Sequence, residues 1–346
     1  MSFSNIILAF STLTLFNQYK IRMNKLVPLL FLCLSQIANA QLTAIGEWNY
    51  NLSFTSAYNV AQNENKIFVA SQSSVFTIDK SDRATAKYSK LNALSDVGVS
   101  SLAYGDDYLF IGYVTGNIDL VQDGYTYNLN DIKRSNNIIG SKEILHATFF
   151  NNDVYVSTGF GIVIINLKKL EIKETIYLGD NGSETPVYST LIKNDTLYAA
   201  SESGLYFIEI DNPFISNYEF WNRVDDFPNG QQNGPISELT EYNDKIFVTY
   251  RNDADGFNDI TYKRTADSWD VINDNQSVLR LKGSPYGLLM VSQNAVELKT
   301  ENGSNIHANY TYQDVYYKPY DAVISEDSTI WIPNLYFGII IDEWDN

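Results

Sequence analysis

The chain has 346 residues, of which 41 are acidic and 24 basic, giving a formal net charge of −17 at pH 7. A field of this sign repels phosphate backbones, so the composition argues against a nucleic-acid partner. Aromatic residues make up 14% of the chain, with 25 tyrosines, and this favours β-strands over helices.

The first 40 residues predict an export signal. From Met23, where we expect translation to begin, Lys25 supplies a positive charge, residues 26–34 form an apolar run, and Ala38-Asn39-Ala40 offers a small-residue cleavage site. We therefore expect a mature chain that begins at Gln41. A membrane anchor is the alternative, but the apolar run is shorter than the roughly 20 residues that a spanning helix needs. No transmembrane segment is expected in the mature chain.

The single cysteine, Cys33, lies inside this leader. It follows Leu32, whereas lipoprotein cleavage requires a small residue there, so lipidation is not expected. Without the leader the chain contains no cysteine, which excludes disulfides, thiol nucleophiles and thiolate zinc sites. Cleavage also removes Lys20, Arg22 and Lys25 but no acid, so the mature chain is still more acidic.

One short segment recurs seven times after the leader. Its anchor is an apolar run whose copies follow each other at spacings of 42, 45, 43, 49, 42 and 42 residues. The anchors are Ile67, Leu109, Val154, Leu197, Ile246, Leu288 and Ile330. A residue suited to a tight turn follows seven positions later, or eight in the last copy: Ser74, Gly116, Gly161, Gly204, Ala295 and Gly338. The fifth copy is interrupted by "NDADGFND", residues 252–259.

Each repeat predicts a four-stranded antiparallel unit. An apolar run precedes the anchor and is separated from it by a polar pair such as Asn-Asp, which suits a two-residue hairpin turn. A fourth, aromatic-bearing strand is visible around Trp221 and Trp269. No helical period is sustained in the mature chain.

Four strands in a repeat of about 42 residues are typical of a β-propeller blade. A sandwich lacks such a fixed period, and solenoid units are shorter. We therefore predict an all-β fold in which residues 41–346 form a single seven-bladed propeller. The segment "GEWNYNLSF", residues 46–54, is expected to complete the last blade and remove an exposed sheet edge.

The histidines and acidic residues of the chain give little indication of a catalytic site. Of the two histidines, His146 lies in a predicted inner strand, where a channel-side or core role is the default, and His307 is expected to face solvent. With 41 acids, pairs of carboxylates arise by chance and do not indicate a glycosidase. Residues 252–259 offer oxygen ligands, but the acid alternation stops after Asp253 and Asp255, so a solvated hairpin tip is favoured over calcium. No enzyme activity, metal or cofactor is predicted.

The surface turns remain as binding candidates. The turns between second and third strands open on one face of a propeller, and they carry aromatic rings beside polar residues that could bind a sugar or a partner loop. The candidates are Tyr113, Asn117, Phe160, Tyr250, Arg251, Asn334 and Tyr336. Packing of some of these rings between blades is the equal alternative.

Two family resemblances converge on these repeats. The repeat pattern is similar to the propeller repeat of two-component regulators. "GEWNYNLSF", "YSKLNALSD", "TGNIDLV" and "TGFGIVIINLKKLEIKETIYLGDNGSE" resemble the N-terminal propeller of the PorZ family, a component of type IX secretion in Bacteroidetes, over essentially all of residues 41–346. The resemblance implies a protein exported through the periplasm to the cell surface, at the outer membrane, without catalytic residues. It also implies protein partners, PorU, PorV and PorQ, in a complex that attaches cargo to anionic lipopolysaccharide.

The chain differs from the family in length, because the family has a second propeller and a C-terminal sorting-type domain. We expect it to be a fragment or a truncated product. Contact with lipopolysaccharide would need a local basic patch, such as Lys168, Lys169 and Lys173, or bridging divalent cations. The function implied is a non-enzymatic surface scaffold. The alternative is an extracellular ligand-sensing propeller of a two-component regulator, which would bind a glycan or small molecule.

Overall fold

The computed structural model describes residues 56–344, except 253–257, 267 and 313–316. The chain divides into two units, Met1–Asn51 and Leu52–Asn346, and all described residues belong to the second. The predicted start, leader and cleavage site lie outside the described residues. So does the expected closing strand, residues 46–54.

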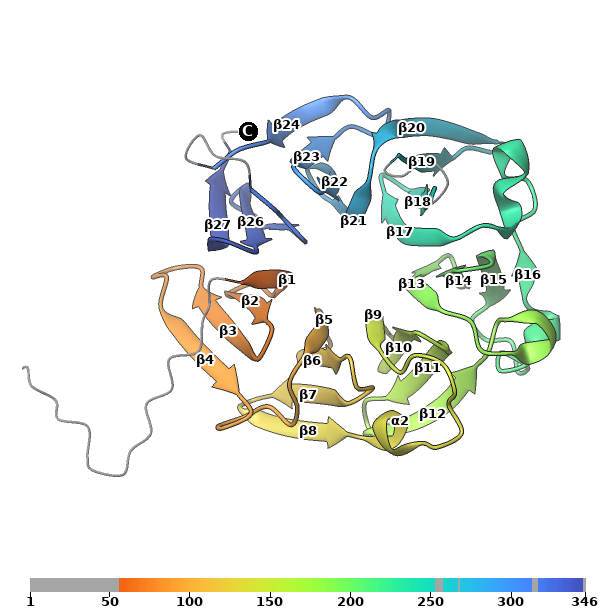
Figure 1. Cartoon of the computed structure of the whole chain (residues 1–346), viewed down its shortest axis with the longest axis horizontal. Helices are drawn as coiled ribbons and strands as arrows, with labels where there is room; N and C mark the ends of the chain where they lie inside the picture. The colour runs from red at the N-terminus through yellow and green to blue at the C-terminus, as the bar shows by residue number, and fades with distance from the viewer. Residues whose placement is uncertain (1–55, 253–257, 267, 313–316, 345–346) are drawn as a thin grey trace, which may run out of the picture. The chain divides into compact units, whose positions relative to one another are not determined.

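Seven antiparallel sheets follow one another along the described chain, and we number them as blades 1 to 7 (Figure 1). Blade 1 contains β1 (Ala57–Gln62), β2 (Lys66–Ser71), β3 (Ser74–Asp79) and β4 (Thr85–Ser89). Blade 2 contains β5 (Val99–Gly105), β6 (Tyr108–Tyr113), β7 (Ile118–Gln122) and β8 (Tyr125–Leu129). Blade 3 contains β9 (Ile144–Phe150), β10 (Asp153–Thr158), β11 (Gly161–Asn166) and β12 (Glu171–Ile176). Blade 4 contains β13 (Val187–Lys193), β14 (Thr196–Ser201), β15 (Gly204–Glu209) and β16 (Asn222–Arg223).

The remaining blades repeat this meander. Blade 5 contains β17 (Ile236–Tyr242), β18 (Lys245–Tyr250), β19 (Asp259–Arg264) and β20 (Trp269–Gln276). Blade 6 contains β21 (Val278–Ser284), β22 (Gly287–Ser292), β23 (Val296–Lys299) and β24 (Asn305–Asn309). Blade 7 shows β25 (Val323–Ile324), β26 (Thr329–Asn334) and β27 (Gly338–Glu343). Helical structure in this part of the chain is limited to α2 (Asp131–Arg134) and the 3-10 turns η1 (Asp180–Gly182), η2 (Tyr218–Phe220) and η3 (Pro228–Asn233).

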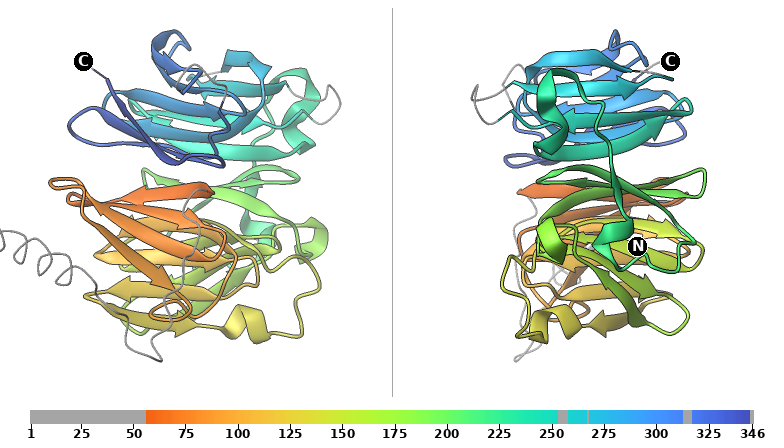
Figure 2. Two further views of the ribbon diagram at one scale, coloured as in Figure 1. Left: turned by 60° about the vertical axis from the view of Figure 1, so that its left-hand side comes forward. Right: turned by 90° about the vertical axis from the view of Figure 1, so that its right-hand side faces the viewer.

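The seven-bladed all-β prediction is confirmed, and the repeat anchors all fall in the second strand of their blades. The first strand of each blade lies toward the centre of the ring in Figure 1, and the later strands lie progressively outward. Figure 2 shows the sheets from the side, with the connecting turns gathered at the two faces.

The predicted turns have the expected backbone geometry. The polar pairs between first and second strands have positive φ at both positions, as in type I′ hairpins. They are Asp106-Asp107, Asn151-Asn152, Asn194-Asp195 and Asn243-Asp244. After the anchors, Gly116, Gly161, Gly204 and Gly338 also have positive φ. At Gly204, with φ +131°, a Cβ would lie 2.5 Å from the carbonyl oxygen of Gln232, so a side chain is excluded there both by torsion and by space.

The core is divided among the seven interfaces between blades. Each cluster of buried apolar side chains joins two neighbouring blades: for example, one brings Phe110 of β6 against Val156 of β10, and another brings Val69 of β2 against Trp331 of β26. Burial of flat sheet faces against each other therefore supplies stability without cysteine.

Polar contacts between first strands complete the ring. Between blades 7 and 1, Asp321 Oδ2 accepts a hydrogen bond from Val60 N at 3.1 Å, and Gln62 Nε2 donates to Ile324 O at 2.7 Å. Arg83 of blade 1 also lies over the ring of Trp331 at 4.5 Å. Closure within the described residues therefore rests on contacts between the blades themselves, and the further closing strand stays a prediction.

Candidate functional site

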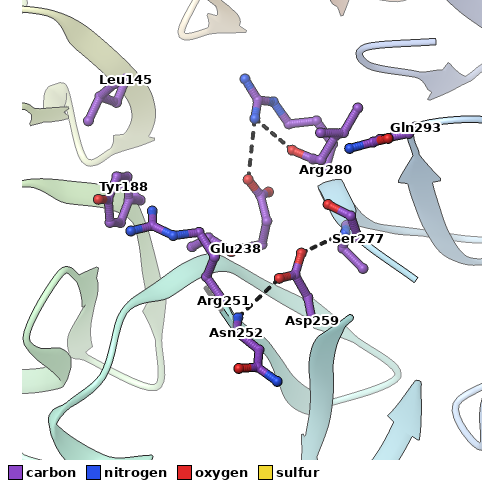
Figure 3. A pocket seen from close by; sticks show the side chains of 12 residues that line it. Leu145, Tyr188, Glu238, Arg251, Asn252, Asp259, Ser277, Arg280 and Gln293 are labelled. Carbon is purple, nitrogen blue, oxygen red and sulfur yellow. Dashed lines mark hydrogen bonds and ion pairs between the residues drawn. The ribbon is translucent and has the colours of Figure 1, made fainter. Parts of the chain in front are cut away.

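A polar pocket of about 390 Å³ opens where the first strands of blades 4 to 6 begin (Figure 3). Strand direction alternates within each blade, so this end of the first strands lies on the same face as the turns between second and third strands. We call it the channel-mouth pocket. Its polar lining comes from the starts of β13, β17, β19 and β21 and from the connections after β18, β20 and β22.

A recurring irregularity aims side chains into this region. In blades 1 to 6 the pairing of the first strand with the second contains a β-bulge. It lies between the residues that stand ten and eight positions before the anchor. Such bulges redirect side chains and often lie beside binding sites. The residues that follow the bulge are all polar: Asn59, Ser101, His146, Ser189, Glu238 and Arg280.

Glu238 and Arg280 form the central charged pair of the pocket. Arg280 Nη1 lies 3.4 Å from Glu238 Oε1 and donates to Leu279 O at 2.7 Å, while Leu281 N donates to Glu238 Oε2 at 3.2 Å. Burial raises the pKa of Glu238 to about 7, and Arg280 opposes this rise. Glu238 can therefore exchange a proton near neutral pH.

A second charged group lines the outer side of the pocket. Arg251 Nη2 donates to Glu202 Oε2 at 3.0 Å, and its guanidinium carbon lies 5.2 Å from the centre of the Tyr188 ring. The Tyr188 hydroxyl also bonds to Glu202. This geometry combines an ion pair with a cation–π contact and holds the guanidinium in one place.

Asp259 fixes the backbone at the pocket floor. Its carboxylate accepts hydrogen bonds from Asn252 N at 3.2 Å and from Val278 N at 2.8 Å, which ties blade 5 to the start of β21 (Figure 3). It is 6% exposed. This carboxylate therefore has a structural role in shaping the pocket.

Charged residues continue along the channel below the pocket. Lys282 pairs with Asp321, joining blades 6 and 7. Burial, together with the positive charges of the nearby Arg280 and Lys282, lowers the pKa of His146 to about 4. This agrees with the predicted channel-side position of His146. His307, expected in solvent, is instead half-buried, with Nε2 2.8 Å from Asp342, because β24 packs beside the end of β27.

Two of the predicted binding aromatics belong to the core. Tyr113 and Phe160 are both 0% exposed, and the Tyr113 hydroxyl donates to Asp119 at 2.6 Å. Burial raises the pKa of Tyr113 far above its ordinary value. Packing between blades, the alternative for these rings, is what the structure shows.

The two predicted asparagines are buried as well. Asn117 accepts a hydrogen bond from Asn128 at 3.0 Å and organises the end of blade 2. Asn334 Oδ1 accepts from the backbone nitrogens of Tyr336 at 2.8 Å and Phe337 at 3.2 Å. Asn334 therefore shapes the turn that presents two aromatic rings.

The other three predicted residues reach the surface to different extents. Tyr250 is half-buried among the aromatic residues of blades 4 and 5, whereas Tyr336 is 55% exposed. Phe337 is 40% exposed and packs on Tyr312 with ring centres 5.1 Å apart. Arg251 alone of the seven candidates lines the channel-mouth pocket. A binding role for these residues stays a prediction.

Sequence reasoning missed Glu238, Arg280 and Tyr188. A signal was available, since Glu238 and Arg280 stand at the same repeat position, eight residues before their anchors, where the other blades also carry small or polar residues. Opposite charges at equivalent positions in adjacent repeats predict a pair across the blade boundary.

The other candidate sites are weaker. Among residues 56–344, apart from the gaps, no group of three or more His, Cys, Asp or Glu side chains is arranged to hold a metal ion. Asp253 and Asp255 of the considered calcium loop lie outside the described residues.

Of the suggested basic patch, Lys169 pairs with Glu171 and Lys173 with Asp153, so their charges are partly neutralised. The described part of the chain also contains no helix with the length and apolarity required to cross a bilayer.

Part of the chain is similar to a known family of propeller domains. Residues 67–222 match the family model described as the N-terminal β-propeller domain of PorZ of the type IX secretion system. The structure of PorZ from Porphyromonas gingivalis, described as an essential bacterial surface component of that system, matches with a TM-score of 0.67 at 20% identity. The chain is a β-propeller, and somewhat less than half of it is similar to this family domain.

The chain spans less than half the length of this solved structure. The alignment includes 87% of this chain but 40% of the PorZ chain. The alignment therefore leaves more than half of the relative without a counterpart in this chain.

Other solved structures, with lower identity, share the propeller fold of this chain. BamB from Moraxella catarrhalis matches with a TM-score of 0.51 at 11% identity, covering 82% of each chain. The WD40 domain of Doa1 matches with a TM-score of 0.60 at 12% identity, covering 83% of this chain and 92% of that one. These matches support the fold alone. No curated protein matches the sequence.

Proposed function

We propose that this PorZ-like propeller is a non-enzymatic scaffold of the type IX secretion attachment complex at the cell surface. In this role it is exported, contacts PorU, PorV or PorQ, and assists the sortase-dependent anchoring of cargo. The observation that carries the proposal is the match of residues 67–222 to the PorZ N-terminal propeller. The fold and the charge of the chain are compatible with a protein-binding surface module.

The channel-mouth face supports a binding role. It presents the fixed guanidinium of Arg251 and, from blade 7, the exposed rings of Tyr336 and Phe337. Arginine and large aromatic side chains contribute disproportionately to the energy of protein interfaces. The same face therefore offers both a polar pocket and apolar anchors to a partner.

The surroundings of the two histidines support a non-enzymatic role. With a pKa near 4, His146 is a weak general base at neutral pH, and His307 is held against Asp342. Both side chains are explained by packing and hydrogen bonding. Neither lines the channel-mouth pocket.

Co-isolation tests the scaffold role. The full chain, tagged and expressed in a bacterium with type IX secretion, should recover PorU, PorV or PorQ from gently solubilised outer membranes, in amounts comparable to the bait. An exported propeller unrelated to secretion, expressed at the same level, is the control. Recovery of none of the three from correctly localised bait would contradict the proposal.

A further inference from the structure

A second pocket, of about 430 Å³, lies between blades 1 and 2, and its lining is divided about equally between apolar and polar residues. The apolar part includes Phe68, Tyr88, Tyr104, Leu109, Ile111 and Val121, and the polar part includes Asn63, Asn65 and Gln122. The rings of Phe68 and Tyr104 stack across the blade boundary with centres 5.6 Å apart and planes 11° apart. We call this the interblade pocket. Its volume is sufficient for an aromatic side chain.

The rim of the interblade pocket is acidic. Asp107 comes from the turn between β5 and β6, and Asp123 from the turn between β7 and β8. Both side chains are exposed, as is the adjacent Asp106. Within the described part of the chain none of these three carboxylates forms an ion pair, and one basic residue, Lys66, also lines the pocket.

The interblade pocket is separate from the channel-mouth pocket. It opens beside the turns that join first to second and third to fourth strands, whereas the channel-mouth pocket lies at the opposite ends of the strands. The two pockets share no lining residue. A partner bound at one would leave the other accessible.

We propose that the interblade pocket receives an aromatic side chain, flanked by Lys or Arg, from a loop or peptide of a partner protein. The apolar part of the lining would shield the ring from water, and the two rim aspartates would attract the flanking cations. The inference rests on the proposed scaffold function and adds the chemistry of one docking segment. Charge complementarity favours a basic segment, since the whole chain has a net charge of −17.

Synthetic peptides test this chemistry directly. The purified chain is titrated with acetyl-Gly-Lys-Phe-Lys-Gly-amide carrying a fluorinated ring, and binding is followed by fluorine NMR at low ionic strength. Two matched peptides replace both Lys by Glu or the Phe by a fluorinated aliphatic residue of alanine size. We expect at least about tenfold weaker binding when the ring is lost, because little apolar surface is then buried. We expect a similar loss on charge reversal.

Two variants assign the binding to this pocket. Asp107→Asn with Asp123→Asn keeps residues that tolerate positive φ, so both turns are retained while the rim loses its charge. This double variant should weaken the Lys-Phe-Lys peptide about fivefold and reduce its advantage over the Glu peptide. Val121→Trp should fill the pocket and abolish binding. Asp82→Asn with Asp270→Asn removes two acids elsewhere and should change nothing.

Several outcomes would overturn the proposal. These are no binding of the Lys-Phe-Lys peptide at millimolar concentration, equal binding of the three peptides, or unchanged binding in the Asn double variant. A dimer of the chain that is lost in Val121→Trp would assign the pocket to a second copy instead. Since the assay uses purified chain and peptides, its failure leaves co-isolation of the attachment proteins unaffected, and the two proposals can fail separately.

Discussion

The turns between second and third strands differ between blades 2 and 3 on one side and blade 7 on the other. In blades 2 and 3 the rings of Tyr113 and Phe160 turn inward and are 0% exposed, whereas in blade 7 Tyr336 is 55% exposed. Phe160 and Tyr336 occupy the same repeat position, six residues after their anchors, whereas Tyr113 comes two residues earlier and ends β6. Whether a turn aromatic supports the core or faces solvent is therefore decided by the neighbouring blade, which either offers a space for the ring or does not.

The largest expected effect is on stability, and it separates the two kinds of turn. Phe160→Ala should lower the free energy of unfolding by about 3 to 5 kcal/mol, because it leaves a cavity among the buried side chains of blades 2 and 3. Tyr336→Ala, the matched exposed aromatic, should change it by no more than about 0.5 kcal/mol. Urea denaturation of the two variants measures both values. Similar losses in the two would remove the distinction.

The pH dependence of stability should report the buried acid of blade 5. The folded chain keeps a proton on Glu238 up to its pKa of about 7, whereas the unfolded chain releases it near the ordinary value of 4.5. The folded state therefore binds more protons between these values, and stability falls as pH rises through this window.

Replacing Glu238 should remove this dependence. Between pH 4 and pH 8, wild type should lose on the order of 2 to 3 kcal/mol relative to Glu238→Gln, whose side chain does not titrate. Urea denaturation of both proteins across that range provides the measurement. Parallel stability curves would show that Glu238 titrates normally.

A smaller effect is expected at the turn of blade 4. Gly204→Ala should cost about 1 to 3 kcal/mol, because its φ of +131° is unfavourable for alanine and the new Cβ meets the Gln232 carbonyl. Gly124→Ala is a useful comparison, since φ is +81° but nothing lies within 4 Å of the new Cβ. If Gly204→Ala loses more stability than Gly124→Ala, the difference measures the cost of the contact between the new Cβ and the Gln232 carbonyl oxygen. Equal losses would mean that torsion alone matters.

The local features of the fold were predictable from the sequence, and the contacts between repeats were less so. Anchors such as Ile67 and Val154 and turn pairs such as Asn194-Asp195 depend on residues close in the chain, and the structure confirms them. The pocket depends on pairs such as Glu238 and Arg280, which are 42 residues apart. Their meeting requires both the correct blade order and the recurring bulge that aims the first-strand side chains into the channel.

The burial of individual turn residues could not be predicted for a similar reason. Tyr113 and Tyr250 are each the last residue of the anchored strand of their blade, yet the first donates a hydrogen bond to Asp119 inside the core and the second stays half-buried. The difference comes from which acceptors and cavities the adjacent segments supply. The local pattern of a single sequence does not predict these contacts.

The central claim, that the channel-mouth face binds proteins of the attachment complex, is tested most directly by a surface double variant. Arg251→Ala with Tyr336→Ala removes one guanidinium and one exposed ring from this face. Phe214→Ala with Phe220→Ala is the control, because these stacked rings are 53% and 42% exposed and lie in the connection between β15 and β16. Each is compared with wild type for the amounts of PorU, PorV and PorQ that are co-isolated from cells.

We expect the Arg251 and Tyr336 double variant to recover at least about tenfold less of its partner, as for the loss of interface hot spots. The Phe214 and Phe220 control should recover as much as wild type. Melting temperatures of both purified variants should remain near that of wild type. Full recovery of the attachment proteins by a correctly folded Arg251 and Tyr336 double variant would contradict the claim.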